Sequence, residues 1–263
     1  SIAALRRRGY TPESIRKFVD LVGVSKANSS VDYAMLEYCI REDLKLKKPR
    51  LMAILDPVKL VIDNYPEGQM EELEIPMNLE NPELVSRIVP FGKELYIERE
   101  DFMEVRPSKY FRLYPGNEVR LMGAYFVTCI GCEKDENGNV TVVHCTYDPQ
   151  TKGGSSQDGR KVKGTIHWVA AQTAKTAECR LYENIINEEE GKLDSEGNLN
   201  LNPNSLTVVP ECYIEPELAK AQAFDSFQFV RNGYFCADCK DSRPEHLVFN
   251  RIVSLKSSFK VAK

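Results

Sequence analysis

The spacing of apolar residues divides the chain into a short helical part and a longer part made of strands. Up to about residue 48, apolar residues recur every three or four positions, which is the spacing of an amphipathic helix. Beyond that point they form short alternating runs that end at Gly, Pro, Asn or Asp, as strands do. The sequence therefore predicts a mainly β fold with an N-terminal α-helical subdomain.

Two helices are predicted in the first part. Thr11 is typical of an N-cap, Pro12 of the first helical position, and Gly23 of a helix end. A second helix is predicted from Ser29 or Ser30. Because most helical stability comes from tertiary packing, we expect this small pair to pack against a neighbouring domain. The expected apolar stripes are Ile15, Phe18, Val19 and Val22 in the first helix, and Val31, Ala34, Met35, Tyr38 and Leu44 in the second.

The remaining chain is predicted to form one or two closed β-barrels. The clearest hairpin joins 124–132 to 140–147, because Asn137-Gly138 favours the positive φ angles of a type I′ turn. Residues 169–187 fit either a strand or a short helix, and the polar stretch 188–204 predicts a loop. Further strands are expected at 51–55, 58–62, 206–209, 227–235 and 247–255.

The composition narrows the class of protein. With 35 Lys and Arg against 39 Asp and Glu, the net charge of −4 argues against indiscriminate nucleic-acid binding but allows local basic patches. The longest apolar runs are far shorter than the ~20 residues that span a bilayer, so no membrane segment is expected. Eight irregularly spaced cysteines in a chain of 263 residues indicate a reducing, cytoplasmic location. The abrupt start, without a signal peptide, suggests that the chain is part of a longer one.

The sequence offers little that could perform catalysis. Gly153-Gly154 lacks the strand–turn–helix context of a phosphate-binding loop, and no nucleophile motif occurs. The histidines have no metal-ligand spacing, and His144 and His167 fall within strand patterns, which favours packed or hydrogen-bonded rings. We expect this chain alone to be non-catalytic.

Two CxxC pairs provide an alternative interpretation. Cys129 and Cys132 form one pair, and Cys236 and Cys239 form the other. Two such pairs can build a tetrathiolate zinc site, although their long separation requires that folding bring them together. A zinc-stabilised interaction module therefore stays open, beside the interpretation of these thiols as small apolar residues.

Basic residues gather at turns and junctions of the otherwise acidic chain, most clearly in 158–168, where Arg160, Lys161 and Lys163 precede a strand with the only Trp. Lys and Arg neutralise phosphates, and an Arg fork bonds both acceptors of a guanine edge. Nearby Tyr and Phe rings can stack on unpaired bases. The clusters predict an RNA-binding surface.

Seven segments along nearly the whole chain resemble the glutaminyl-tRNA synthetase family. They are 5–11 (LRRRGYT), 39–44 (CIREDL), 56–62 (DPVKLVI), 116–121 (GNEVRL), 158–168 (DGRKVKGTIHW), 227–229 with 233–235 (FQF and GYF), and 248–251 (VFNR). The resemblance covers the C-terminal half of that family. It implies a missing catalytic domain that binds ATP and Mg²⁺, a glutamine tRNA as partner, contact with that catalytic domain, no DNA binding, and a monomer.

The resemblance also implies an architecture. Residues 1–48 would form a helical connector, 49–105 with 205–263 a proximal β-barrel, and 106–204 a distal β-barrel inserted in the proximal one. These are the ribosomal-protein-like anticodon-binding barrels of the family, and the anticodon bases would lie at the junction between them.

The same resemblance assigns roles to individual residues. Arg50 and Gln228 correspond to the residues that engage the middle anticodon base, and Arg231 would support their pocket. Arg112 corresponds to the reader of the third base, a guanine. Three positions depart from the family pattern: Phe111 replaces a lysine, Met122 an arginine and Val230 a carboxylate. The anticodon set is Arg50, Lys109, Arg112, Arg120 (near the first base), Gln228 and Arg231; the tRNA backbone set is Arg6, Arg7, Arg8, Lys45, Lys47, Lys48, Arg160, Lys161 and Lys163.

Other functions remain possible at this stage. The anticodon-binding half of a eukaryotic or archaeal-type glutamyl-tRNA synthetase shares the barrels, and the segments 158–168 and 248–251 favour the glutamine enzyme. A ribosomal-RNA-binding protein with a similar barrel is a further alternative, against which the helical connector argues.

Overall fold

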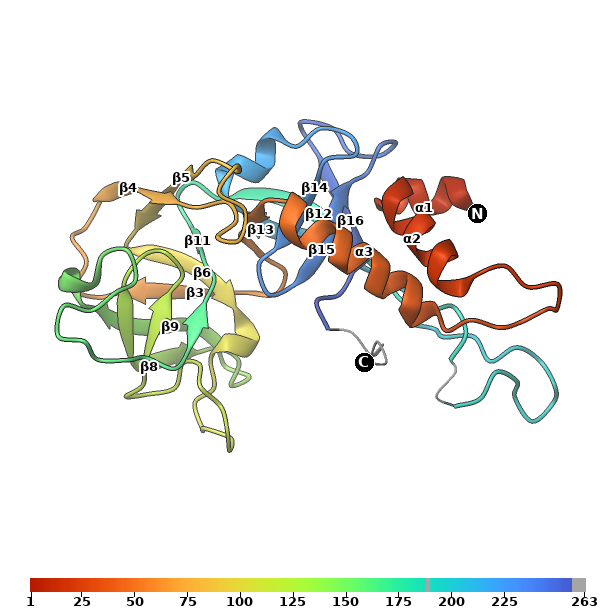
Figure 1. Cartoon of the computed structure of the whole chain (residues 1–263). Coiled ribbons are helices and arrows are strands. Elements are labelled where there is room, and N and C mark those ends of the chain that lie inside the picture. Colours follow the sequence, from red (N-terminus) through yellow and green to blue (C-terminus); the bar gives the residue numbers. More distant parts are fainter. Residues whose placement is uncertain (188–189, 257–263) are drawn as a thin grey trace.

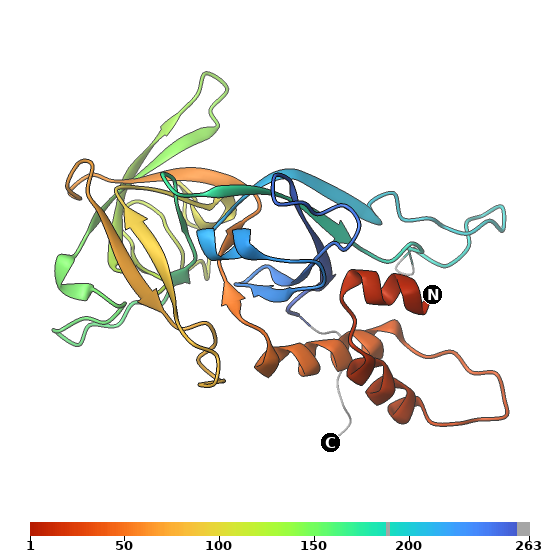
Figure 2. The same ribbon diagram turned by 90° about the horizontal axis from the view of Figure 1, so that it is seen from above.

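The computed structural model describes residues 1–187 and 190–256. Figure 1 shows three bodies in a row, with the helical subdomain beside the N-terminus, one barrel in the middle and a second barrel at the far end. The view from above in Figure 2 shows the same order. Within the described part of the chain, no helix combines the length and the apolar character required to cross a membrane.

The helical subdomain contains α1 (Ile2–Arg8), α2 (Pro12–Val22) and α3 (Tyr33–Lys47). The first predicted helix is confirmed as α2: Thr11 caps it by accepting a 3.2 Å hydrogen bond from the Ser14 amide, and Gly23 ends it. The predicted start of the second helix was wrong. Asp32 caps α3 at the Ala34 amide, so Val31 lies outside the helix and is exposed.

These helices do not form a separate core. Tyr10 from the α1–α2 turn and Leu36, Ile40 and Leu44 from α3 share one buried cluster with strand residues such as Ile252. Arg41 adds a polar anchor, because its Nε donates to the Ser254 carbonyl at 2.6 Å. The expectation that the helices pack on a neighbouring domain is therefore confirmed.

The distal barrel is one sheet whose strands all come from 57–170. Its order is β10-β7-β8-β9-β3-β6-β11, and its core includes Leu60, Val127 and Trp168. A hairpin of β4 (Met70–Ile75) and β5 (Arg87–Gly92) packs beside it. The sheet comprises β3 (Pro57–Ile62), β6 (Glu94–Glu98), β7 (Glu118–Leu121), β8 (Phe126–Lys134), β9 (Val140–Tyr147), β10 (Thr165–Ile166) and β11 (Val169–Ala170), with 3-10 turns at Arg99–Asp101 and Pro149–Thr151.

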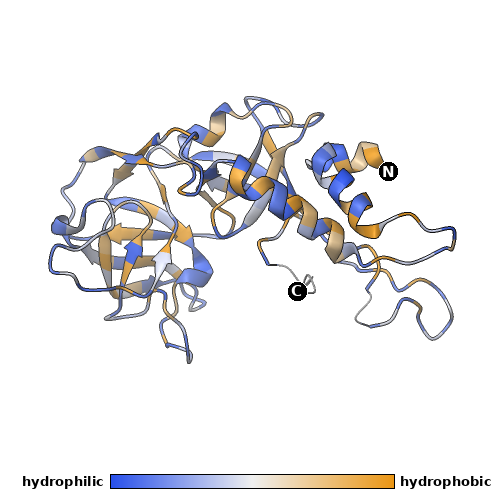
Figure 3. Ribbon diagram, in the orientation of Figure 1, coloured by the Kyte–Doolittle hydropathy of each residue, from blue (hydrophilic) through white to orange (hydrophobic). Residues whose placement is uncertain are grey.

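The proximal barrel takes strands from both sides of this insertion. Its order is β1-β14-β15-β16-β12-β13-β2, and its core includes Phe229, Phe235 and Phe249. In Figure 3 the apolar residues of both barrels lie mostly on the strands, whereas the connecting loops are mostly hydrophilic. The strands are β1 (Arg50–Leu51), β2 (Ala53–Ile54), β12 (Lys175–Tyr182), β13 (Leu206–Ile214), β14 (Ser226–Phe229), β15 (Gly233–Ala237) and β16 (Leu247–Val253), with a 3-10 turn at Pro216–Lys220.

The mainly β fold with two barrels, one inserted in the other, is confirmed, but strand pairing divides the chain at other positions than predicted. β3 and β6, assigned to the proximal barrel, pair with distal strands, and β12, assigned to the distal barrel, pairs with β13 and β16. The predicted domain boundaries differ from this pairing because β3 pairs in parallel with β9, and no local sequence pattern identifies that partner. Residues 188–189 and 257–263 of the predicted domains lie outside the described residues.

The predicted hairpin is confirmed as β8 and β9, but its turn type was wrong. Gly138 has φ 80°, whereas Asn137 does not have a positive φ, which a type I′ turn requires at both positions. The Asp135 carboxylate accepts hydrogen bonds from the Asn137 and Asn139 amides, both at 2.9 Å. This side chain replaces the predicted dipeptide as the determinant of the turn. The ambiguous stretch 169–187 contains strands β11 and β12 and no helix.

Polar and aromatic contacts fasten the two barrels together. The ring of Tyr96 on β6 stacks on that of Tyr213 on β13, with centroids 4.0 Å apart. Arg87 on β5 forms a buried ion pair with Glu215, with Nη2 2.8 Å from Oε2. Because stacked rings and a buried paired charge both require defined geometry, these contacts fix how the barrels are oriented.

Candidate nucleic-acid interface

Arg50 and Gln228 lie directly opposite each other on paired strands. β1 runs parallel to β14, and the register sets Arg50 against Gln228. Both line a cleft of about 420 Å³ between α3 and the proximal barrel. Its other lining residues are Tyr38, Arg41, Glu42, Lys45, Glu80, Tyr234 and Leu255.

This cleft contains both charges and aromatic rings. Arg50 Nη2 donates to Glu80 Oε1 at 2.9 Å, and the Lys45 ammonium lies 3.6 Å from Glu80 Oε2. The hydrogen bond from Arg50 lowers the pKa of Glu80, so this carboxylate is ionised at neutral pH. The cleft therefore offers guanidinium, ammonium and amide donors beside the Tyr38 and Tyr234 rings.

A second group of cations lies where the two barrels meet. The Asp101 side chain is fully buried and accepts two hydrogen bonds from Arg231, at 2.6 and 2.7 Å. Its Oδ1 also accepts from Arg112 Nη1 at 3.2 Å. One carboxylate thus holds a guanidinium of the distal barrel and another of the proximal barrel.

The turn between β14 and β15 joins this group to the cleft. Arg231 occupies the left-handed region at φ 65°, which is uncommon for a residue other than glycine. The next residue, Asn232, donates from its side-chain Nδ2 to the Ala53 carbonyl and to Glu98 Oε1, both at 3.1 Å. Gln228 lies three residues before Arg231, so the turn connects the cleft to the barrel junction.

The structure brings together four of the six predicted anticodon residues, namely Arg50, Gln228, Arg112 and Arg231, in these two adjoining groups. Lys109 is exposed at φ 59° in the same segment as Arg112. Arg120 lies within the distal barrel, where its Nε donates to the Gly154 carbonyl at 2.6 Å and its guanidinium covers the Phe126 ring. The assigned base contacts of all six stay predictions.

Sequence reasoning missed the carboxylates that hold these cations. Asp101, Glu98 and Glu80 carry no local pattern that distinguishes them from solvated acids, because their partners are distant in sequence. His167 was expected to be packed, and it is buried with Nδ1 3.2 Å from Arg231 Nη1. The one available signal was the segment 99–101, where three charged residues interrupt a strand pattern.

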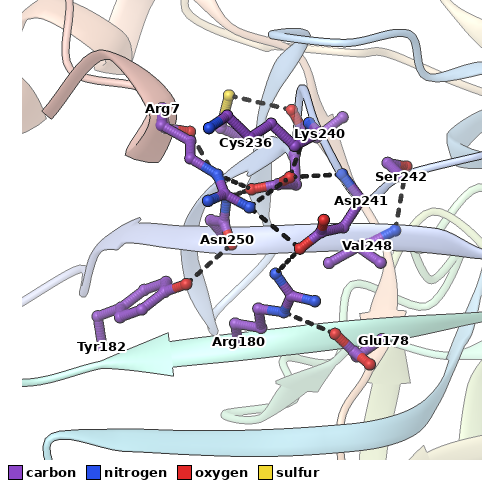
Figure 4. A network of polar contacts seen from close by, with 12 residues as sticks. Arg7, Glu178, Arg180, Tyr182, Cys236, Lys240, Asp241, Ser242, Val248 and Asn250 are labelled. Carbon is purple, nitrogen blue, oxygen red and sulfur yellow. Dashed lines mark hydrogen bonds and ion pairs between the residues drawn. The ribbon is translucent and has the colours of Figure 1, made fainter. Parts of the chain in front are cut away.

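Some of the cations predicted to contact the tRNA backbone are paired within the chain, and others are exposed. Arg7 is part of a polar network on the proximal barrel, in which its Nη2 lies 3.0 Å from Asp241 (Figure 4). Its Nε lies 2.8 Å from Asp238, and the Arg7 side chain is 36% exposed. Burial acts to raise the pKa of Asp238, but hydrogen bonds from Arg7 and Asn250 outweigh it and lower the pKa. This geometry favours a structural role for Arg7 over the predicted phosphate contact.

Other cations of the helical subdomain also have partners. Arg8 donates to the Ile252 carbonyl at 2.9 Å and Arg6 lies over the Phe224 ring. Lys47 pairs with Asp43, as Lys45 does with Glu80. Lys48 has no ion-pair partner among the described residues.

The arginine of the segment 158–168 has partners within its own barrel. Arg160 pairs with three carboxylates of its own barrel, Glu118 at 2.8 Å, Asp148 at 2.6 Å and Asp158 at 2.8 Å. Arg160 thus already has anionic partners within the chain, and its contact with the tRNA backbone stays a prediction.

The two lysines beside Arg160, Lys161 and Lys163, are exposed. Lys161 has no ion pair in the described part of the chain, and the Lys163 ammonium lies 5.2 Å from the centre of the Phe111 ring. Gly164 is required here, because a Cβ at this position would lie 1.9 Å from the Phe111 carbonyl oxygen. The close approach places Lys163 next to the segment that carries Arg112.

The structure does not bring the two CxxC pairs together into one site. Cys129 and Cys132 lie on β8 of the distal barrel, whereas Cys236 on β15 and Cys239 belong to the proximal barrel. Among the residues described, no group of three or more His, Cys, Asp or Glu side chains is arranged to hold a metal ion. The buried thiols instead pack as small apolar residues.

Two regions of the chain match known protein families. Residues 48–148 and 165–238 each match families described as "tRNA synthetases class I (E and Q), anti-codon binding domain". Similar curated proteins are the glutamine–tRNA ligases of Clostridium perfringens (57% identical over 99% of this chain), Clostridium kluyveri (54% over 99%) and Vibrio cholerae (50% over 98%). The chain spans 47%, 47% and 46% of these relatives, about half their length. The chain thus belongs to the class I tRNA synthetases of the E and Q type and carries their anti-codon binding domain.

Proposed function

We propose that this chain recognises the anticodon loop of a glutamine tRNA. The observation that carries the proposal is the pair of adjoining cation groups, the cleft of Arg50 and Gln228 and the junction of Arg112 and Arg231. Guanidinium and amide groups pair with base edges through two parallel hydrogen bonds, which specifies bases rather than phosphates alone. The two groups would receive neighbouring unstacked bases.

The charge distribution supports recognition over indiscriminate binding. The chain is acidic overall, so a polyanion is repelled except where cations gather. Lys161 and Lys163 are exposed on the distal barrel, and they are our candidates for contacts with the RNA backbone. Phosphate contacts of this kind would position the loop, and the two cation groups would read its bases.

The choice of glutamine over glutamate rests on the relatives, which are named glutamine–tRNA ligases. We propose that the ligase containing this chain attaches glutamine to its tRNA in the cytoplasm, with ATP and Mg²⁺ bound by the remainder of that protein. In this proposal the chain itself is a non-catalytic monomer that contacts the catalytic domain and does not bind DNA.

The proposal is tested by binding of this chain to a glutamine-tRNA anticodon stem-loop. The native loop is compared with three variants, each changed at one anticodon base. We expect changes at the middle and third bases to weaken binding by about 1–3 kcal/mol each, which is typical of a lost bidentate contact. A glutamate-tRNA stem-loop serves as the matched control. Equal affinity for all these loops would contradict the proposal.

A further inference from the structure

We infer that Asp101 is a positioning residue that aligns the third-base reader with the middle-base pocket. The inference rests on the proposed function. It assigns no new ligand to the chain and concerns how the proposed base-reading residues are held. It concerns a buried carboxylate that does not itself contact RNA.

Asp101 lies between two guanidinium groups from different barrels. Its side chain is fully buried and makes three hydrogen bonds, two to Arg231 and one to Arg112. Two cations held close together repel each other, and the attraction of an anion between them offsets that repulsion. The carboxylate therefore sets both the distance and the relative orientation of the guanidinium groups.

The backbone of Asp101 reinforces this arrangement. Its carbonyl accepts a 2.9 Å hydrogen bond from the Leu113 amide, and the Leu113 carbonyl accepts one at 3.0 Å from Met103. Residue 112 is thus fixed by its own side chain and by the neighbouring main chain. A rigid frame of this kind keeps the Arg112 donors oriented before RNA arrives, which reduces the entropy lost on binding.

On the other side, Asp101 holds a turn that leads to the middle-base pocket. Arg231 has a left-handed backbone at φ 65°, a strained conformation that surrounding contacts must stabilise. The Val230 amide donates to the Leu51 carbonyl at 3.0 Å, next to Arg50. Loss of the Asp101 charge would therefore loosen the Arg231 turn together with the Arg112 side chain.

A nearby carboxylate provides a matched control. Glu100 lies 3.8 Å from Arg112 Nη1, but its side chain is 75% exposed and pairs with no other cation at the junction. The Glu100→Gln variant removes a charge from the same neighbourhood without disturbing the buried frame. We expect it to discriminate between bases as the unmodified chain does.

The decisive comparison is between Asp101→Asn and the unmodified chain, with stem-loops changed at the third or the middle base. We expect Asp101→Asn to lose about tenfold of the preference for the native third base, a loss comparable with that of one bidentate contact. Adding Arg112→Ala should produce little further loss, because both changes remove the same contact. Preference at the middle base should fall by a smaller factor.

A second variant guards against unfolding. Removal of one partner from a buried ion pair is strongly destabilising, so Asp101→Asn is measured at a temperature where circular dichroism shows it folded. Arg231→Lys keeps both charges but removes the two-point contact. It should reduce third-base preference although residue 231 is assigned to the middle base.

The outcomes separate this inference from the proposed function. If the unmodified chain does not distinguish the stem-loops, the proposed function fails whatever Asp101 does. If the unmodified chain distinguishes them and the folded Asp101→Asn and Arg231→Lys variants keep its third-base preference, the inference alone is overturned. A uniform loss of affinity with unchanged preference also overturns it, because that is the result of a purely structural role.

Discussion

The barrel junction and the segment 158–163 both concentrate cations, yet the two regions use them differently. At the junction, one buried carboxylate is shared by two arginines, and Arg112 remains 37% exposed. In 158–163, one arginine is surrounded by three carboxylates although its side chain is 34% exposed, and Lys161 and Lys163 lie exposed beside it. The ratio of anions to cations therefore separates a candidate recognition site from a structural ion cluster.

This comparison teaches that a basic cluster in a sequence does not by itself indicate a phosphate site. Arg160 is the most strongly paired cation of its segment, and the hydrogen bonds that it donates to Glu118, Asp148 and Asp158 hold its pKa above the ordinary value. Lys161, one residue away, has no such partner among the described residues. Adjacent residues of the same charge can thus have different functions.

The largest effect is expected from Arg112 at the junction. Arg112→Ala should weaken binding of the glutamine-tRNA stem-loop by about 1–3 kcal/mol and relax the preference for guanine at the third position. Titration with third-base variants measures both quantities, and Arg106→Ala, an exposed arginine of the same segment, is the control. An unchanged preference would remove Arg112 from the base-reading site.

The next effect concerns the exposed lysines of the distal segment. Joint replacement of Lys161 and Lys163 by Ala should lower affinity for all stem-loops alike and reduce the salt-dependence slope by about 1 per lysine. Arg160→Gln should leave the slope unchanged but lower the Tm, because three carboxylates lose their common partner. Should Arg160→Gln flatten the slope as much as the lysine variant, the division drawn above would be wrong.

A smaller effect is expected at the cleft, where Glu80 accepts a hydrogen bond from Arg50. Bound RNA competes for the same guanidinium donors, so Glu80→Gln should tighten stem-loop binding at low salt. Since solvent screens an exposed ion pair, the gain should not exceed about fivefold. Weaker binding by this variant would mean that Glu80 supports Arg50 instead of competing for it.

The smallest expected effect is a dependence of folding stability, but not of RNA binding, on pH. His144 on β9 is held between Asp63 and Glu133, both at 2.7 Å, and these hydrogen bonds raise its pKa above the ordinary 6.5. The contribution of this cluster to stability is thus complete below about pH 6.5 and is lost as the pH rises through the raised value. Urea unfolding at pH 6 and pH 8.5 should show a difference that shrinks in His144→Gln, while base preference is unaffected.

Local signals predicted the parts of this molecule that depend on neighbours in sequence. Thr11 and Gly23 bounded a helix correctly, and Asn137-Gly138 located a hairpin although Asp135 decided its turn type. The pairing of Arg50 with Gln228 was anticipated only through the family resemblance. Partners distant in sequence, such as Asp101 for Arg231 or β9 for β3, could not be predicted, because strand register and buried charge pairing are decided by tertiary packing.

The inserted barrel has a consequence for how the chain assembles. All strands of the distal sheet lie in 57–170, and both points where the chain enters and leaves it are tied to β6: the Leu55 amide to Glu98 at 2.8 Å, and the Ala171 amide to the Glu94 carbonyl at 3.0 Å. Once that sheet has formed, the chain segments that lead to β2 and β12 are both held by β6, and much of the entropy of closing the long intervening loop has been lost beforehand. We expect refolding kinetics in which the inserted unit forms first and nucleates its host.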